Sequence, residues 1–255
     1  MIKLKSNEEI KILREGGKLL AKVLWDTAEL VKVGASTADL NNFAEKAIYD
    51  LGGRPSFKNY GAEMGNPFPA GLCTSVNKEI VHGIPSAEKT LKNGDIISLD
   101  IGMEYKGLYT DMAITLAVGE VKQEVLDLIK VTKESLYKGI KAIKKGGNLS
   151  DIGAAVQNHA ESHNYGVVRD LVGHGVGHAV HEDPQVPNYK SLFAKNIKIE
   201  KGLVIAIEPM LTMGDYNIKS LADGWSIVTR DGSLSAHWEH TIAVGENGVE
   251  IITEL

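Results

Sequence analysis

Residues 96–111, IISLDIGMEYKGLYTD, contain two largely apolar segments on either side of a short turn at 105–107. Apolar runs of this length, separated by a glycine turn, indicate two neighbouring strands. A tight turn brings Asp100 and Asp111 opposite or nearly opposite each other, with both carboxylates on the same face of the sheet. Two facing negative charges repel each other unless a cation lies between them. The stretch therefore predicts one side of a metal site together with the strands that carry it.

Other metal-binding side chains occur in similar surroundings. Glu208 ends the apolar run 203–208 as Asp100 ends its own run, and burying either carboxylate without a partner would be costly. His174 lies in a glycine-rich turn at 173–178, where glycines permit unusual φ angles and a close approach of the backbone, so a ligand role is favoured. Glu239 lies in a predicted strand.

Four carboxylates and one imidazole suit two adjacent divalent cations, because carboxylates can bridge. Two such cations about 3.5–4 Å apart can hold a shared water and lower its pKa. This chemistry points to metal-assisted hydrolysis. The predicted ligands are Asp100, Asp111, His174, Glu208 and Glu239.

The sequence contains an internal repeat. A glycine followed five residues later by an aspartate opens a helical pattern at Asp39 and again at Asp151, 112 residues further on. A carboxylate also follows a glycine by six residues at Asp100 and at Glu208, 108 residues apart. These offsets are too long for a solenoid. They predict one pseudo-twofold domain over residues 1–255, with halves of about 1–120 and 121–255 and the site where the halves meet.

Apolar residues at helical spacing predict four helices. The first begins at a capping box formed by Ser6 and Glu9. Strands fill much of the remaining sequence, so an α+β fold is expected. The other expected elements are a helix from Leu40 to the glycines at 52–53, helices at about 123–142 and 152–160, a strand at 237–244, a turn at 245–248 and a strand at 249–253.

Composition narrows the functional classes. Hydrophobic residues make up 43% and charged residues 24% of the chain, as in ordinary globular proteins. The net charge of −5, without a long basic block, argues against nucleic-acid binding. Cys73 is the one cysteine, which excludes an intrachain disulfide and a cysteine-rich zinc site. No signal-like segment and no run of about 18 apolar residues is present, so a cytoplasmic protein without a membrane span is expected.

The histidines need separate interpretation. His159 and His163 are four residues apart, but no His-Glu-x-x-His pattern surrounds them and His159 lies on an apolar helix face, so a structural role is preferred. His82, in a tight glycine and proline turn, and His181 are better candidates for function. Hydrolysis needs groups that hold the scissile carbonyl and the leaving nitrogen, and imidazoles can do both.

Taken together, these motifs resemble those of the type I methionine aminopeptidases. That family has the pita-bread fold, a pseudo-twofold repeat of helices packed on a curved antiparallel sheet. The resemblance covers nearly the whole chain, and the short interval of 34 residues from His174 to Glu208 matches type I, because type II enzymes carry a large insertion there. The motifs are VHGIP at 81–85, DIISLD at 95–100, TD at 110–111, GHGVG at 173–177, EP at 208–209 and EHT at 239–241.

The resemblance implies a role for each candidate residue. Asp100 would chelate one metal, Asp111 and Glu239 would bridge both, and His174 and Glu208 would complete the second, with Glu208 also the catalytic base. The family's substrate-contacting histidines match His82 and His181, and its methionine side-chain pocket matches Cys73, Tyr60 and Trp225. The implied cofactors are two divalent cations per chain, Co²⁺, Mn²⁺, Fe²⁺ or Zn²⁺, and a monovalent cation near Asn77, Glu79 and Ser235.

The implied activity is removal of the N-terminal methionine from nascent proteins when the second residue is small, by hydroxide attack at a two-metal site. A monomer with a transient ribosome contact is expected. Two departures from the family pattern affect the pocket: residues 62–67 form a longer stretch before Cys73, and Val180 replaces an aromatic residue present in some members. The alternatives are another aminopeptidase of this fold and a non-catalytic protein-binding relative.

Overall fold

The computed structural model describes residues 2–246 and 248–255. Two ten-residue strands, β4 (Ile96–Tyr105) and β5 (Leu108–Ala117), form the predicted pair and are joined by a short turn. The turn uses Lys106 and Gly107, which both have positive φ angles, as tight hairpin turns require. Asp100 pairs with Ala113 rather than directly with Asp111, so the two aspartates are diagonal neighbours on one face.

The pair β4–β5 belongs to a nine-stranded sheet built from both halves of the chain. Its order is β1-β4-β5-β14-β9-β7-β8, with β2 beside β4 and β15 beside β14, and every pairing is antiparallel. The junction of β5 with β14 joins the first half to the second. The remaining strands of this sheet are β1 (Arg54–Pro55), β2 (Leu72–Val76), β7 (Gly173–Gly175), β8 (Glu182–Val186), β9 (Val204–Ile207), β14 (Glu239–Val244) and β15 (Val249–Ile251).

Two smaller antiparallel sheets lie beside the large one. The first has the order β13-β10-β6 and the second the order β11-β12-β3. Their strands are β3 (Glu79–Val81), β6 (Gly166–Val167), β10 (Met210–Thr212), β11 (Ile218–Ser220), β12 (Ile227–Thr229) and β13 (Ser235–His237).

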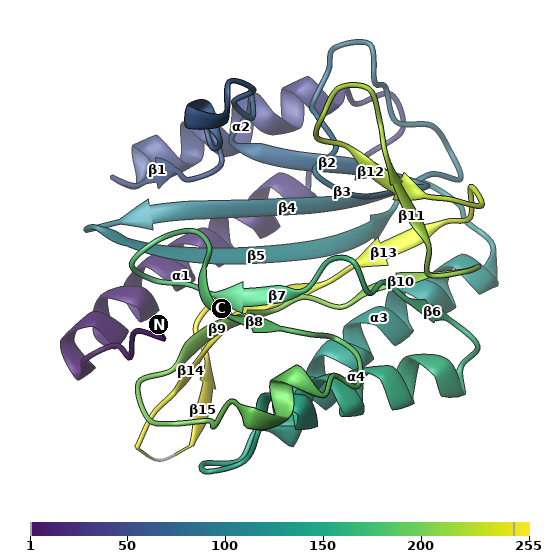
Figure 1. Cartoon of the computed structure of the whole chain (residues 1–255). Coiled ribbons are helices and arrows are strands. Elements are labelled where there is room, and N and C mark those ends of the chain that lie inside the picture. Colours follow the sequence, from purple (N-terminus) through teal and green to yellow (C-terminus); the bar gives the residue numbers. More distant parts are fainter. Residues whose placement is uncertain (1, 247) are drawn as a thin grey trace.

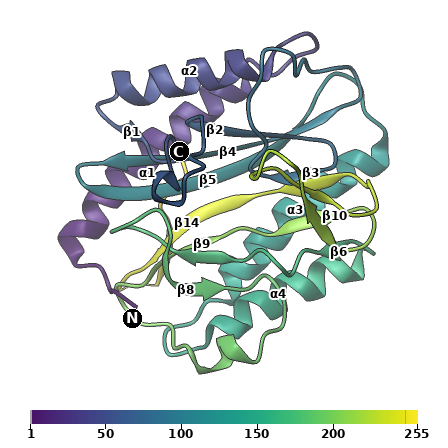
Figure 2. The same cartoon turned by 45° about the horizontal axis from the view of Figure 1, so that its top comes forward.

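Four helices cover the large sheet, as predicted. Figures 1 and 2 show α1 packed beside β4 and β5, α2 beside β1 and β2, and α3 and α4 beside the half that contains β9 and β14. The predicted capping box of Ser6 and Glu9 starts α1. Among the described residues, no helix combines the length and the apolar character that a membrane span requires. The helices are α1 (Asn7–Ala28), α2 (Thr37–Asp50), α3 (Gln123–Ala142) and α4 (Leu149–Ser162), with 3-10 turns η1 (Ala62–Met64) and η2 (Phe193–Asn196).

Alternation along the strands separates the apolar core from the face that carries the candidate site. Ile97, Leu99 and Ile101 of β4 lie in the core that the helices share with Ile205 and Ile207 of β9. Successive side chains of a strand point to opposite faces. The residues between these positions therefore point away from the helices, and the predicted carboxylates are among them.

The internal repeat is visible as matching turns. Ser36 caps α2 and forms an isolated bridge with Thr90, and Asn148 caps α4 and forms a bridge with Lys198. Each half then runs from its capped helix to a strand that leads to a carboxylate. The predicted α+β arrangement of two similar halves on an antiparallel sheet is confirmed.

Two local predictions need correction. The segment 173–178 was expected to be a turn, but its first part is strand β7. A Cβ atom on Gly173 would lie 2.3 Å from the carbonyl oxygen of Ala206, and one on Gly175 would lie 2.2 Å from that of Asp183, so the glycines allow β7 to fit between β9 and β8. The strand expected at 237–244 is interrupted at Trp238, and Asn247 of the expected turn lies outside the described residues.

Lys5 joins the N-terminal segment to the start of β8 through a buried ion pair with Glu182. Its ammonium also donates to the carbonyl oxygen of Lys3 at 3.0 Å. Lys5→Met leaves the Glu182 carboxylate largely buried without its counter-charge, so we expect the free energy of unfolding to fall by about 3–5 kcal/mol. Urea denaturation measures this change.

The exposed pair of Lys22 and Asp26 serves as the control, because Lys22→Met should change the free energy of unfolding by less than about 1 kcal/mol. The double variant Lys5→Met/Glu182→Leu should recover much of the loss, since it removes both charges. An unfolding midpoint that does not move in Lys5→Met would contradict the predicted role of the pair.

Candidate metal centre and substrate pocket

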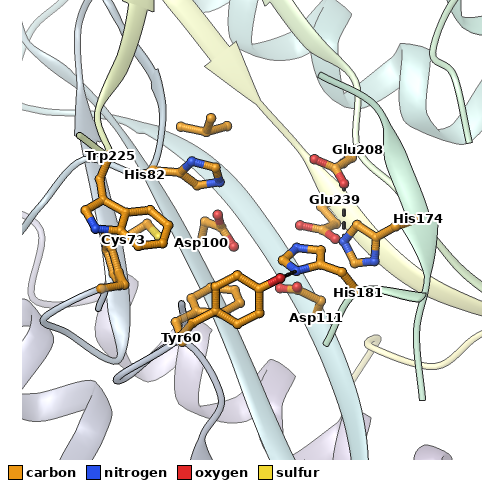
Figure 3. Close-up of a pocket in the computed structure, with 13 residues that line it drawn as sticks. Tyr60, Cys73, His82, Asp100, Asp111, His174, His181, Glu208, Trp225 and Glu239 are labelled. Carbon is orange, nitrogen blue, oxygen red and sulfur yellow. Dashed lines mark hydrogen bonds and ion pairs between the residues drawn. The ribbon is translucent and has the colours of Figure 1, made fainter. Parts of the chain in front are cut away.

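Four carboxylates converge on the sheet face opposite the helices (Figure 3). Asp100 projects from β4, Asp111 from β5 and Glu239 from the first position of β14, while Glu208 directly follows β9. His174 of β7 completes the group. Ligand atoms of Asp111, His174 and Glu239 lie within 4.8 Å of one another, and His174 Nε2 is 3.4 Å from Glu208 Oε1. The fold thus gathers side chains that lie up to 139 residues apart in the chain.

The chemistry of these side chains fits divalent cations. Asp111 and Glu239 are each only 2% exposed. Asp100 Oδ1 and Glu239 Oε1 have no hydrogen-bond partner within the described part of the chain. Burying such oxygens without partners is costly. Carboxylate oxygens and an imidazole nitrogen are ligands for first-row divalent metals, which would satisfy these atoms.

The pKa values of these carboxylates show that burial disfavours their ionised form. Burial raises the pKa of Asp100 to about 7. Burial, with repulsion from the neighbouring carboxylates, also raises the pKa values of Asp111, Glu208 and Glu239 well above their usual range. Four negative charges therefore cannot coexist here without added positive charge.

His174 is held in the form that binds metals. Its Nδ1 lies 2.9 Å from the carbonyl oxygen of Gly175, so an N–H at Nδ1 donates there and Nε2 presents its lone pair to the carboxylates. Burial lowers the pKa of His174 to about 3, which keeps the ring neutral. A neutral imidazole with a fixed tautomer is a typical metal ligand.

An aromatic and sulfur-containing wall faces the carboxylates across one cavity. Figure 3 shows Tyr60, Cys73 and Trp225 on the side opposite Glu208 and His174. The thiol of Cys73 reaches the carboxylates because Cys73 of β2 pairs directly with Asp100 of β4. Phe57 and Phe68 also line this cavity, although sequence reasoning did not single them out.

The stretch 62–67 contributes to this wall. The indole N–H of Trp225 donates to the carbonyl oxygen of Asn66 at 3.1 Å. The Trp225 ring also stands edge-on to Phe68 and Tyr60, with ring centroids 5.3 and 6.5 Å away. The longer stretch therefore braces Trp225, and Tyr60 remains in the cavity lining.

The two candidate substrate histidines line the same cavity. His82 follows β3 and has a φ angle of 57°, a conformation uncommon for residues other than glycine and often found at functional sites. Burial lowers the pKa of His82 to about 4. His181 precedes β8, and its Nδ1 lies 2.8 Å from the hydroxyl of Tyr60. Its ring is 4.3 Å from that of His174, measured between centroids.

Sequence reasoning assigned no metal contact to His237, which lies beside the carboxylates. Its buried Nε2 is 3.8 Å from Glu208 Oε2 and 3.9 Å from Glu239 Oε2. Its position two residues before Glu239 was the available signal, because alternate residues of a strand share a face. His159, by contrast, lies outside the cavity lining and interacts with Glu134 at 3.2 Å, in line with the structural role preferred for it.

The residues expected near a monovalent cation have protein partners. The backbone N–H of Ser235 donates to the carbonyl oxygen of Asn77 at 3.0 Å, so these two residues are neighbours. The Glu79 carboxylate accepts hydrogen bonds from Lys89 at 2.9 Å and from the backbone N–H of Val76 at 2.8 Å. The charge of Glu79 is therefore balanced by Lys89.

Comparison with known proteins identifies the family to which the chain belongs. Residues 11–246 match the family model of metallopeptidase family M24. The methionine aminopeptidase of Clostridium acetobutylicum is 46% identical over 253 residues, covering 99% of both chains, and methionine aminopeptidase 1 of Bacillus subtilis is 44% identical over 100% of both. The crystal structure of the methionine aminopeptidase from Thermotoga maritima superposes with a TM-score of 0.95 at 42% identity and covers 100% of both chains.

More distant structures share the fold alone. The prolidase from Pyrococcus furiosus superposes with a TM-score of 0.77 at 20% identity, and the match covers 99% of this chain and 65% of that one. The fold is therefore the pita-bread fold common to these enzymes, while full-length sequence similarity separates the chain from the proline-specific members. The chain belongs to metallopeptidase family M24, and the full-length relatives compared above are methionine aminopeptidases.

Proposed function

We propose that this metal-dependent aminopeptidase removes the N-terminal methionine of polypeptides. The observation that carries the proposal is one cavity that joins a buried set of carboxylates and His174 to an aromatic wall containing Cys73. The family of the chain and the activity named for its full-length relatives support the same reaction.

The proposed ligands are those of the predicted set. Asp100, Asp111, His174, Glu208 and Glu239 would together hold two divalent cations, drawn from Co²⁺, Mn²⁺, Fe²⁺ and Zn²⁺. Bound cations would supply Lewis acidity and lower the pKa of a coordinated water. The burial of the carboxylates keeps the site in a low-dielectric environment, where each electrostatic interaction is stronger than in water.

Glu208 is the proposed general base. It directly follows β9, and its carboxylate lies near both His174 and His237. A carboxylate at this position can accept a proton from the attacking water and then donate it to the leaving nitrogen. A base whose pKa lies near the working pH is the most effective for both steps.

His181 and His82 are proposed to hold the reacting peptide. If the hydroxyl of Tyr60 donates to His181 Nδ1, the ring proton is held on Nε2, which then donates to the carbonyl oxygen as negative charge develops there. His82 lines the same cavity and is proposed to contact the substrate backbone or the departing amide.

The side chain of the first residue is proposed to lie against Tyr60, Cys73 and Trp225. This part of the cavity, whose whole volume is about 80 Å³, offers aromatic faces and one sulfur atom, which suit an unbranched thioether. An adjoining groove of about 430 Å³, lined by Leu171 and Met210, would accommodate the rest of the polypeptide.

Peptide cleavage tests the proposal. Metal-free protein refilled with Mn²⁺ or Co²⁺ should release methionine from Met-Ala-Ser. Cleavage of Met-Ile-Ser should be slower by at least roughly 10- to 200-fold, because one misfit methylene group already costs that much and isoleucine exceeds alanine by three carbons. Acetyl-Met-Ala-Ser, which lacks the free α-amine, should not be cleaved. Release of methionine is measured by chromatography. The refilling is repeated with Fe²⁺ and Zn²⁺, and no release with any of these four metals would refute the proposed activity.

Further properties stay predictions. They are a monovalent cation beside Asn77, Glu79 and Ser235, a monomeric state, a single catalytic domain over residues 1–255, a transient ribosome contact and a cytoplasmic location.

A further inference from the structure

Strand β14 changes partners next to the proposed metal ligands. Glu239 and His240 pair with β5, whereas residues from Ile242 onward pair with β15. Thr241 occupies the position between these two segments. It therefore lies where β14 separates from β5, two residues beyond Glu239 and opposite Asp111.

The hydroxyl of Thr241 bridges this separation. Its Oγ1 accepts the backbone N–H of Asp111 at 2.9 Å and donates to the backbone carbonyl of the same residue at 2.8 Å. The backbone of Thr241 is bonded to the residues that follow β15, where its N–H donates to Thr253 Oγ1 at 3.1 Å and its carbonyl accepts from Ile252 N–H at 2.8 Å. One side chain thus replaces the backbone hydrogen bonds that a continuous β5–β14 ladder would make to Asp111.

A second threonine makes the same contact at the other end of the junction. Thr115 Oγ1 of β5 accepts the backbone N–H of His237 at 2.8 Å and donates to its carbonyl at 2.8 Å. The three facing pairs are equally spaced along antiparallel strands: 111 with 241, 113 with 239 and 115 with 237. One threonine hydroxyl therefore lies at each end of the short segment in which the two halves of the chain pair directly.

A hydroxyl inserted between two strands holds their backbones further apart than a direct N–H···O=C bond does. At Thr241 this wider interval occurs beside Asp111 and Glu239, whose side chains come from the two strands concerned. Thr241 and Thr253 are fully buried, so water does not substitute for these contacts. The side chain of Asp111 is also fixed locally, because Met112 N–H donates to its Oδ1 at 2.9 Å.

We propose that Thr241 is a positioning residue that sets the spacing of Asp111 and Glu239 and thereby the affinity of the site for divalent cations. This inference rests on the proposed metal role of those two carboxylates. Partners that orient metal ligands commonly change metal affinity by 10- to 100-fold when they are removed. Thr241 would act in this way through the backbone of Asp111.

Binding of Mn²⁺ to metal-free protein, measured by isothermal titration calorimetry, tests the proposal. Thr241→Val keeps the shape of the side chain and removes both hydrogen bonds, so Mn²⁺ should bind about 10- to 100-fold more weakly. Thr241→Ser restores the hydroxyl and should bind close to the unchanged protein. Thr27→Val is the matched control, because buried Thr27 donates only to the carbonyl of Val23 within α1 and should leave Mn²⁺ affinity unchanged.

Each outcome has a separate meaning. Equal Mn²⁺ affinity of Thr241→Val and the unchanged protein would overturn the inference, as would an equal loss in Thr241→Ser or in Thr27→Val. If Thr241→Val does not fold, Thr241→Ala carries the same comparison with Thr241→Ser. Failure of the unchanged protein to bind Mn²⁺ would instead overturn the proposed function, and the inference with it.

Discussion

Replacement of Glu208 by glutamine is expected to lower kcat for Met-Ala-Ser by about 10²- to 10⁴-fold, the usual contribution of a general base. Glutamine keeps the size of the side chain but cannot take up the proton of the attacking water. The native Glu208 carboxylate can both accept that proton and return it to the leaving nitrogen. Steady-state kinetics at saturating Mn²⁺ measure the loss.

Saturation matters because Glu208 is also a proposed ligand. Metal content must therefore be measured alongside the rate, so that lost binding is separated from lost proton transfer. Glu29→Gln at the exposed end of α1 is the matched control and should keep full activity. A Glu208→Gln protein that holds its full complement of metal and retains most of its kcat would refute the assignment of Glu208 as the base.

Removal of divalent metal is expected to abolish activity and to lower the free energy of unfolding. At a free metal concentration about 1,000 times the dissociation constant, binding adds about 4 kcal/mol to stability. The site gives a specific reason for this sensitivity, because the metal-free protein must keep Asp111 and Glu239 buried beside other carboxylates. Thermal unfolding with EDTA and with Mn²⁺ measures the difference.

The same carboxylates predict how stability varies with pH. Their pKa values in the folded protein lie above the unfolded values, about 7 for Asp100, so the folded state retains protons that the unfolded state releases. The stability of metal-free protein therefore falls as pH rises through these raised pKa values. Buried His174 and His237, with pKa values of about 3, act in the opposite sense, since the unfolded state takes up protons below about pH 6.5.

The carboxylate contribution should thus be lost from about pH 4, the unfolded pKa, upward through the raised folded values, about 7 for Asp100. The histidine contribution is gained between about pH 3 and about pH 6.5 and opposes this loss. Above about pH 6.5 the carboxylates act without this opposition, so the stability of metal-free protein should decline there. Saturating Mn²⁺ should flatten this alkaline decline, because the bound carboxylates are ionised throughout. Asp100→Asn should reduce the decline in metal-free protein, since one titrating group is removed. An alkaline decline of equal size with and without Mn²⁺ would show that these carboxylates do not couple stability to pH.

Local chemistry in the sequence was sufficient for much of this description. The strands β4 and β5, the capping box at Ser6 and the repeated helix starts follow from patterns that act over a few residues. Asp100 and Glu208 were recognisable because each ends an apolar run, where an unpaired carboxylate is costly. The five proposed ligands could therefore be named before their distances were known.

The tertiary structure alone decided which segments are neighbours. Period-two alternation gives the face of a side chain but not the strand that lies beside it. Hence neither the contact of Thr241 with Asp111, 130 residues away, nor that of Lys5 with Glu182, 177 residues away, was visible in the sequence. The glycines of β7 looked like a turn because the close approach of β8 and β9 that requires them is made only when distant segments pack together.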